Sequence, residues 1–184
     1  MLAEPLAHVS SFAHLEDPAL IKARYSTEVF YLDTCNVGFG VFANRDLARG
    51  ETILFFTGPI IDFAETKRRG PKECMAIQIE PDLYLDTQAP GVFVNHSCSP
   101  NAGIRDDARL VALRKIPKGE EIRFDYSTTM EEQSFTMNCL CGAPNCRRIV
   151  TDFSLLPGQV KTRYMALRIV MGFIHHRNRW RTFV

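Results

Sequence analysis

The 184-residue sequence lacks several features that would assign it to a particular class of protein. No apolar run approaches the roughly 20 residues that a membrane-spanning helix needs, so we expect no membrane segment. Residues 1–18 carry acids and prolines instead of a basic stretch followed by an apolar one, which does not resemble a secretory signal. Internal repeats and low-complexity segments are also lacking. We therefore expect a soluble intracellular protein, cytoplasmic or nuclear.

Charge of one sign is not in excess, because 22 Lys and Arg face 21 Asp and Glu and the net charge is +1. This balance excludes a global field that would draw the whole protein to nucleic acid. The charge is nevertheless uneven, since residues 151–184 hold six Lys or Arg against the single acid Asp152. That basic tail could touch nucleic acid, or it could be a solvated helix end, where cations are favourable. The remaining, more acidic body could favour a basic peptide.

Cysteine is absent from residues 1–30, and the six cysteines fall into two classes. Cys35 and Cys74 stand alone in apolar surroundings and are expected to be small buried hydrophobes. The others are Cys98 and a close group near the C-terminal end, Cys139, Cys141 and Cys146. Without a secretory signal, this spacing favours a metal site over disulfides.

The hydrophobic pattern predicts a mostly β protein. From residue 28 to residue 126, short apolar runs rich in Phe, Val, Ile and Tyr alternate with Gly, Pro, Asn and Asp, as in short strands. The predicted strands are 29–33, 40–43, 52–58, 74–80, 83–86, 110–114 and 121–126, with a brief helix or loop at 65–69. Residues 1–28 are expected to be a helical lead-in. Apolar residues at helical spacing predict one helix over 159–180.

Three motifs in the predicted β region could carry chemistry, although each also has a purely structural reading. The pair Gly38 and Gly40 lets a ligand or another strand approach the backbone, or simply makes a tight strand entry. Residues 95–101, Asn-His-Ser-Cys-Ser-Pro-Asn, can anchor a functional loop or form a buried hydrogen-bonded turn. Tyr126, at the end of Phe-Asp-Tyr, could be an ordinary residue at the edge of the core.

The cysteine motif is the most specific of the four. Cys139, Cys141 and Cys146 fall within eight residues, and the intervening Gly and Pro-Asn let the chain turn back on itself. This pattern fits a tetrahedral zinc site, which needs a fourth ligand from elsewhere. Cys98 is the natural candidate for that ligand, and Cys35 is the alternative.

Taken together and in this order, the motifs resemble the SET-domain lysine methyltransferases that carry a post-SET segment but no cysteine-rich pre-SET region. The resemblance covers residues 31–150, and it includes the run Gly119-Glu120-Glu121-Ile122 that leads into Phe-Asp-Tyr. It implies a SET fold of several short β-sheets with a pseudoknot. The implied division is a helical lead-in (1–28), a SET domain (29–130), a post-SET zinc segment (131–150) and a C-terminal helical tail (151–184).

The resemblance also implies a role for each matching residue. The cofactor would be S-adenosylmethionine, and the catalytic residue would be Tyr126. Contacts to the cofactor are implied for Gly38, Phe39, Gly40, Asn95, His96, Tyr126 and Leu140. Phe124 and Phe56 would border the lysine channel. A structural zinc ion would be held by Cys98, Cys139, Cys141 and Cys146.

The implied reaction is methyl transfer to the side-chain amine of a lysine in a histone or another protein. Phe rather than Tyr at position 124 favours di- or trimethylation, because a phenol there would crowd additional methyl groups. The sequence departs from the family at Phe56, where a Tyr is usual. Two alternatives therefore remain open: a SET-like enzyme that acts on a small-molecule amine, and a binding module without activity.

Overall fold

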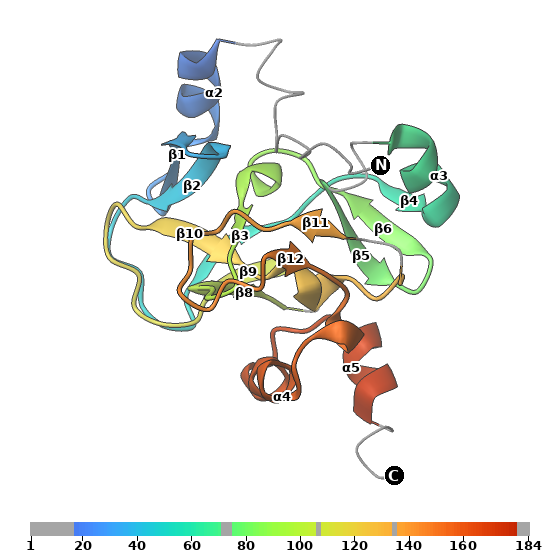
Figure 1. Cartoon of the computed structure of the whole chain (residues 1–184). Helices are drawn as coiled ribbons and strands as arrows, with labels where there is room; N and C mark the ends of the chain where they lie inside the picture. The colour runs from blue at the N-terminus through green and yellow to red at the C-terminus, as the bar shows by residue number, and fades with distance from the viewer. Residues whose placement is uncertain (1–16, 71–74, 106–107, 134–135, 180–184) are drawn as a thin grey trace.

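The computed structural model describes residues 17–70, 75–105, 108–133 and 136–179, and it folds them into small β-sheets flanked by short helices (Figure 1). The strands are β1 (Phe30–Cys35), β2 (Gly38–Ala43), β3 (Thr52–Phe55), β4 (Ile60–Asp62), β5 (Ala76–Glu80), β6 (Leu83–Asp86), β7 (Asn95–His96), β8 (Ala102–Ile104), β9 (Arg109–Ala112), β10 (Glu121–Phe124), β11 (Met137–Asn138) and β12 (Ile149–Val150). The α-helices are α2 (Pro18–Tyr25), α3 (Phe63–Arg69), α4 (Gly158–Leu167) and α5 (Gly172–Arg179), and the 3-10 turns are η2 (Gly91–Phe93), η3 (Tyr126–Thr129) and η4 (Phe153–Leu155). The mostly β architecture expected from the sequence is confirmed.

One four-stranded sheet, in the order β1-β2-β10-β7, brings together motifs that are far apart in the sequence. The hairpin of β1 and β2 is antiparallel, and β10 extends it with Glu121 opposite Phe42 and Ile122 opposite Val41. On its other side β10 pairs with β7 in parallel, so that Arg123 lies opposite Asn95 and Phe124 opposite His96. The strand that ends in Phe-Asp-Tyr therefore lies directly beside the Asn-His dipeptide.

Three smaller sheets complete the β structure: β3-β9-β8, β4-β6-β5 and the two-stranded β11-β12. Strand β10 alternates as a half-buried strand should, with Ile122 and Phe124 buried while Glu121 and Arg123 are partly exposed. Leu32, Val41 and Ile122 are almost completely buried and belong to the main core. The antiparallel pair β11-β12 lies over this body in Figure 1 and carries the cysteine segment, residues 138–148.

The short helices at the N-terminal side begin where capping residues predict. The side chain of Asp17 accepts from the N–H of Ala19, and Pro18 occupies the first turn of α2. Asp62 caps α3 in the same way through the N–H of Glu65. Residues 65–69 are therefore helical. Residues 1–16 of the predicted lead-in lie outside the described residues, as does Cys74.

The prediction of one helix over 159–180 is wrong, because the tail contains two helices. Arg168 adopts a left-handed backbone conformation (φ 53°) and ends α4. The chain then runs through Ile169, which packs against Gly103, to Met171, whose N–H donates to the carbonyl of Thr128 at 3.0 Å. Burial of Ile169, Val170 and Met171 together against the sheets requires this break, since three consecutive residues cannot all face one side of a helix.

Several short strands escaped prediction, namely β4, β7, β8, β11 and β12. Each is only two or three residues long, too short for a period-two pattern to appear. Among the residues that the structure describes, no helix combines the length and apolar character needed to cross a bilayer.

Candidate functional site

Asn95 lies on β7, the last strand of the four-stranded sheet, and is 5% exposed. Its side-chain amide donates to the carbonyl of Phe39 at 3.0 Å, to Glu121 Oε1 at 2.8 Å and to the sulfur of Cys35 at 3.4 Å. Asn95 therefore joins β7 to both strands of the hairpin and to β10. The structural reading of this motif, a buried hydrogen-bonded loop, holds for Asn95, and its position also places it on the wall of a pocket.

His96 links the backbone of Tyr126 to the cysteines. Its Nδ1 accepts a hydrogen bond from the N–H of Tyr126 at 3.2 Å, and its Nε2 lies 3.3 Å from the sulfur of Cys98. Because Nδ1 is an acceptor, a neutral His96 carries its proton on Nε2, which faces that sulfur. The His96 and Tyr126 rings meet edge to face at 5.3 Å. His96 thus fixes both the backbone and the ring of Tyr126.

Tyr126 begins the turn η3 directly after β10, and Asp125 caps that turn by accepting from the N–H of Ser127 at 3.1 Å. The Tyr126 hydroxyl donates to the carbonyl of Val94 at 2.9 Å. Its ring lies 4.9 Å from the ring of Phe124. The hydroxyl is therefore held at one backbone oxygen, beside an aromatic wall.

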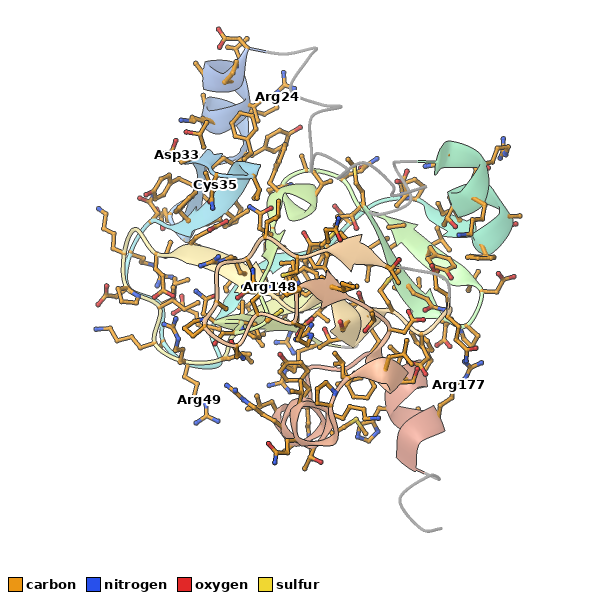
Figure 2. The ribbon with its side chains drawn as sticks, in the orientation of Figure 1. Arg24, Asp33, Cys35, Arg49, Arg148 and Arg177 are labelled. Atoms are coloured by element: carbon orange, nitrogen blue, oxygen red, sulfur yellow. The ribbon has the colours of Figure 1, made fainter. Side chains whose placement is uncertain are left out.

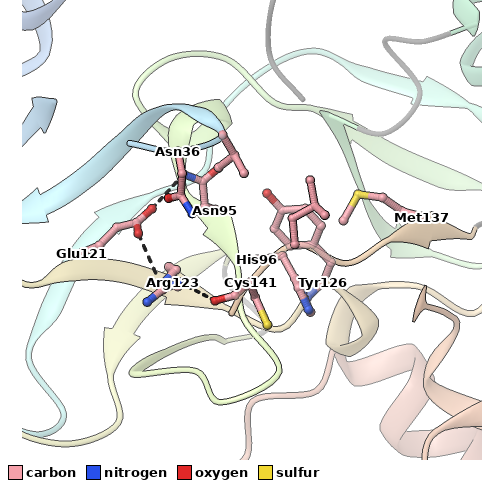
Figure 3. Close-up of a pocket in the computed structure, with 10 residues that line it drawn as sticks. Asn36, Asn95, His96, Glu121, Arg123, Tyr126, Met137 and Cys141 are labelled. Carbon is pink, nitrogen blue, oxygen red and sulfur yellow. Dashed lines mark hydrogen bonds and ion pairs between the residues drawn. The ribbon is translucent and has the colours of Figure 1, made fainter. Parts of the chain in front are cut away.

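Asn95, His96 and Tyr126 line a pocket that is open to solvent (Figure 3). Its lining residues are Asn36, Val37, Asn95, His96, Glu121, Arg123, Tyr126, Met137, Leu140 and Cys141. Of the residues predicted to contact a cofactor, the structure brings Asn95, His96, Tyr126 and Leu140 to this pocket. It does not bring Gly38, Phe39 or Gly40 to the lining.

The glycine motif instead shapes the hairpin beside the pocket. Gly38 has a φ of 112° and follows the turn of Asn36 and Val37, which do line the pocket. A Cβ on Gly40 would lie 2.8 Å from Glu121 Oε1 and 3.3 Å from the amide nitrogen of Asn95. The close approach predicted at this glycine is made by side chains of the protein, since the Phe42 ring would also lie 3.2 Å from such a Cβ. The Phe39 ring is buried against Phe93.

Glu121 and Arg123 were not predicted as site residues, yet they form one wall of the pocket. Arg123 Nε lies 3.5 Å from Glu121 Oε2, and its guanidinium donates to the carbonyl of Cys141 at 3.1 Å (Figure 3). Arg123 therefore ties the cysteine segment to β10. The alternation along β10 could have revealed this wall, because the two charged residues occupy one face of the strand while Ile122 and Phe124 occupy the other.

The two predicted channel residues lie together but do not line the pocket. Phe56 and Phe124 are 4% and 3% exposed, and their rings are 5.5 Å apart. A Cβ on Gly91 would meet the Phe56 ring at 2.7 Å, so this glycine makes room for the ring. Tyr126 lies between this buried aromatic pair and the pocket, because its ring packs against Phe124 and it also lines the pocket.

The cysteine segment folds back onto residues 95–98. The ligand atoms of His96, Cys98, Cys139 and Cys141 all lie within 4.8 Å of one another. The sulfurs of Cys98 and Cys139 are 3.7 Å apart. Four sulfurs bound tetrahedrally at about 2.3 Å lie about 3.8 Å from each other, so this spacing fits zinc.

Cys146 lies beside this group, in hydrogen-bonding contact with the thiols of Cys139 and Cys141. The alternative ligand Cys35 lies elsewhere, at the end of β1, apart from Arg148 of the cysteine segment (Figure 2). It is half-buried rather than buried. The structure therefore gathers four cysteines and one histidine and leaves Cys35 outside.

The thiols differ in how readily they ionise. Burial raises the pKa of Cys98 to about 11 and raises the pKa of Cys139 further still. Burial acts in the same direction on Cys141, but hydrogen bonds from the backbone N–H groups of Cys98 and Ala143 outweigh it and lower the pKa of Cys141 to about 7. Cys141 is thus the thiol of the three that ionises most readily near neutral pH. A bound cation would favour the thiolate form of the others.

A comparison with protein families matches residues 38–127 to the family described as SET domain. The variant-silencing SET domain-containing protein of Plasmodium falciparum is 37% identical over 134 residues, which are 61% of this chain and 5% of that protein. The histone-lysine N-methyltransferase, H3 lysine-36 specific, of Candida albicans is 31% identical over 159 residues, which are 74% of this chain and 19% of that protein. The chain thus spans less than a fifth of the length of these relatives.

Among solved structures, a crystal structure of KRYPTONITE in complex with mCHG DNA and SAH is similar in fold. Its TM-score is 0.54 at 23% sequence identity, and the match covers 66% of this chain and 29% of that one. At this identity the likeness concerns the fold alone. It agrees with the arrangement of small sheets described above.

Proposed function

Because this chain belongs to the SET-domain family, we propose that it is an S-adenosylmethionine-dependent methyltransferase that modifies the side-chain amine of a protein lysine. One observation carries the proposal. The Tyr126 hydroxyl, held at the Val94 carbonyl, stands between an open pocket lined by Asn95 and His96 and a buried aromatic wall. A cofactor pocket and an amine channel would meet at this hydroxyl.

The lining of the pocket suits S-adenosylmethionine in its chemistry. Asn95, His96 and Glu121 supply polar atoms on one side, while Val37, Met137 and Leu140 supply apolar surface on the other. When bound, S-adenosylmethionine supplies a sulfonium methyl group, to which the amine nitrogen bonds as the carbon–sulfur bond breaks and leaves a thioether. Leu140, which is 63% exposed, would gain cover from a nucleoside in this pocket.

The residues around Tyr126 would prepare the amine. A lysine with a pKa near 10.4 is neutral in only about one molecule in a thousand at pH 7.4, and the neutral form is the nucleophile. Surroundings formed by Phe124 and Phe56 disfavour the ammonium, because they offer it no hydration. The hydroxyl of Tyr126 would then orient the amine beside the methyl group, so that positioning supplies most of the rate.

A structural zinc ion would hold the cysteine segment over the pocket. The proposed ligands are Cys98, Cys139 and Cys141, whose ligand atoms lie within 4.8 Å of one another, together with Cys146, which contacts Cys139 and Cys141; this soft donor set fits zinc. His96 can then keep its Nε2 proton and donate a hydrogen bond to the sulfur of Cys98, as residues next to metal ligands commonly do. The ion's effect on the site would be positional, because Cys141 and Leu140 line the pocket.

The substrate we propose is a lysine of a histone or another nuclear protein. Relatives from Drosophila melanogaster and Candida albicans are described as histone-lysine N-methyltransferases. Phe124 leaves the wall of the proposed channel without a hydroxyl, which favours addition of more than one methyl group. Nothing about the pocket favours a small-molecule amine over a lysine, so that substrate is an outcome of the test.

The decisive experiment incubates the protein with methyl-labelled S-adenosylmethionine, core histones and a cell extract. We expect label on protein lysine, and we expect the rate to fall about 10- to 100-fold in Tyr126→Phe, because one orienting hydrogen bond is lost. Tyr31→Phe is the matched control, since Tyr31 lies on β1 against Phe42. Label only on small molecules would mean a different substrate. No transfer by a zinc-loaded protein would contradict the proposal and favour a binding module.

A further inference from the structure

The Asp125 carboxylate, which precedes Tyr126, is fully buried and binds partners from three parts of the chain. Its Oδ1 accepts from Arg147 Nη2 at 2.8 Å, and its Oδ2 lies 2.7 Å from Arg147 Nη1, so the guanidinium forks across both oxygens. The hydroxyl of Tyr164 donates to Oδ2 at 2.9 Å. The N–H of Ser127 donates to Oδ1. These donors saturate the carboxylate.

Each partner belongs to a different functional segment. Arg147 follows Cys146 directly, and its N–H donates to the sulfur of Cys98 at 3.4 Å. Tyr164 lies in α4 of the tail and is 2% exposed. Asp125 itself stands between Phe124 and Tyr126. One buried carboxylate therefore connects the tail helix and the cysteine segment to the loop that carries Tyr126.

The Tyr164 hydroxyl acts only as a hydrogen-bond donor to Asp125 in this arrangement. Burial, and then the negative charge of Asp125, raise the pKa of Tyr164, so the hydroxyl stays protonated. A buried ion pair needs additional hydrogen bonds, because the attraction between the two charges alone does not offset the free energy of removing both from water. Without the hydroxyl, Oδ2 would lose one of its two donors. The carboxylate would then be held only by the fork of Arg147 and the N–H of Ser127, and it could shift away from its present position.

A shift of this carboxylate would move the site, because Asp125 also caps the turn that starts at Tyr126. The hydroxyl of Tyr126 must stay at the carbonyl of Val94, and an error of about 1 Å in such a position can cost about two orders of magnitude in rate. Arg147 belongs to the cysteine segment, so its movement would shift that segment directly, and it would also reach Cys98 through the N–H to sulfur contact.

We propose that Tyr164 of the tail is a positioning residue that, through Asp125, fixes both the Tyr126 loop and the cysteine segment over the pocket. It touches neither substrate nor cofactor. The effect on turnover rests on the proposed methyltransferase function, whereas the effect on loop position does not.

The tail would remain docked without this hydroxyl, which separates positioning from folding. Ile169 packs against Gly103, the N–H of Met171 donates to Thr128, and Arg105 donates to the carbonyl of Arg168 at 3.0 Å. Tyr164→Phe keeps the buried ring and removes one oxygen. We therefore expect the variant to fold.

Tyr84→Phe is the matched control. Tyr84 is 1% exposed, and its hydroxyl donates to Glu132 Oε2 at 2.6 Å, so the same change removes a part-buried hydrogen bond from a tyrosine to a carboxylate elsewhere. Both variants lose comparable stability if the role of Tyr164 is structural only. If Tyr164 fails to tolerate Phe, Arg147→Lys provides a second test, because Lys cannot fork across both oxygens of Asp125.

The experiment measures amide hydrogen exchange by mass spectrometry in peptides covering residues 122–130 and 143–150, together with kcat and KM for methyl transfer. In Tyr164→Phe we expect exchange to rise about tenfold in both peptides and kcat to fall about tenfold, with KM for S-adenosylmethionine within about twofold, as befits one lost hydrogen bond to a charge. Tyr84→Phe should change neither peptide.

Two results would overturn the inference: exchange in Tyr164→Phe that matches Tyr84→Phe, or faster exchange with an unchanged kcat in an active protein. If the unaltered protein transfers no methyl group, the proposed function fails. Faster exchange in Tyr164→Phe would then still support the link from the tail to the loop.

Discussion

Asp152 gives a prediction that depends only on the folded structure. Its side chain lies just after β12, is 1% exposed, and has one oxygen, Oδ1, with no hydrogen-bond partner among the described residues. Burial, followed by the charges of Glu132 and Glu131, raises the pKa of Asp152 from 3.8 to about 6, even though N–H groups of Gln133 and Glu132 oppose the rise. The native protein therefore disfavours the ionised form.

The sign and size of the effect follow from this shift. Below pH 4 the carboxyl is protonated in both the folded and the unfolded chain, so it does not lower the free energy of unfolding. As the pH rises from about 4 to about 6, the unfolded chain releases the proton while the folded one retains it, and the free energy of unfolding falls. The rise of the pKa from 3.8 to about 6 corresponds to about 3 kcal/mol. The free energy of unfolding falls by this amount by pH 6 to 7 and does not change further at higher pH.

The assay is urea unfolding of the protein and of Asp152→Asn at intervals from pH 4 to pH 8. Asparagine does not titrate, so the stability of the variant relative to the original protein should rise by about 3 kcal/mol across this range and then level off. Asp46→Asn is the control, because Asp46 is exposed and its ion pair with Lys115 lowers its pKa, giving the opposite sign. A stability difference for Asp152→Asn that stays flat between pH 4 and pH 7 would refute the reasoning.

Three further predictions concern the site and the tail. Gly103→Ala should destabilise the protein by about 1–3 kcal/mol in urea unfolding, because the new Cβ would lie 2.5 Å from Ile169 Cγ2; an unchanged midpoint would contradict the docking of the tail. Removal of metal by a chelator should release about one zinc ion per chain, measured by atomic absorption, and should abolish methyl transfer until zinc is restored; activity that survives complete removal would argue against the metal's positional role. Phe124→Tyr should shift the products of methyl transfer toward monomethyl-lysine by mass spectrometry, and an identical product distribution would remove that residue from the channel.

The fold and the pocket were predictable from the sequence to different degrees. The ordered motifs identified Asn95, His96 and Tyr126, and the structure brings these three together because β7 and β10 pair in parallel. No local pattern reveals that pairing, since β7 has only two residues. The family resemblance was needed to place them side by side.

Other residues were missed for local reasons. Glu121 and Arg123 alternate with buried residues, and such alternation shows which face is polar but not what that face borders. Gly40 was expected to approach a ligand or a strand, and only the register with β10 shows that Glu121 and Asn95 fill the space. The break at Arg168 was hidden by the apolar positions 160, 164, 167, 171 and 174, which continue at helical spacing through it.

The pairing of β2 with β10 also bears on the order in which the protein can assemble during its synthesis. The hairpin of β1 and β2 can form soon after it leaves the ribosome, but its neighbour begins at Glu121. Until then one edge of β2 has no partner strand within the sheet, and unpaired edges invite wrong pairing. The partners of Asp125 are synthesised later still, first Arg147 and then Tyr164. A growing chain that is halted before the tail therefore has the β2–β10 pairing but still lacks Tyr164, the last donor to Asp125.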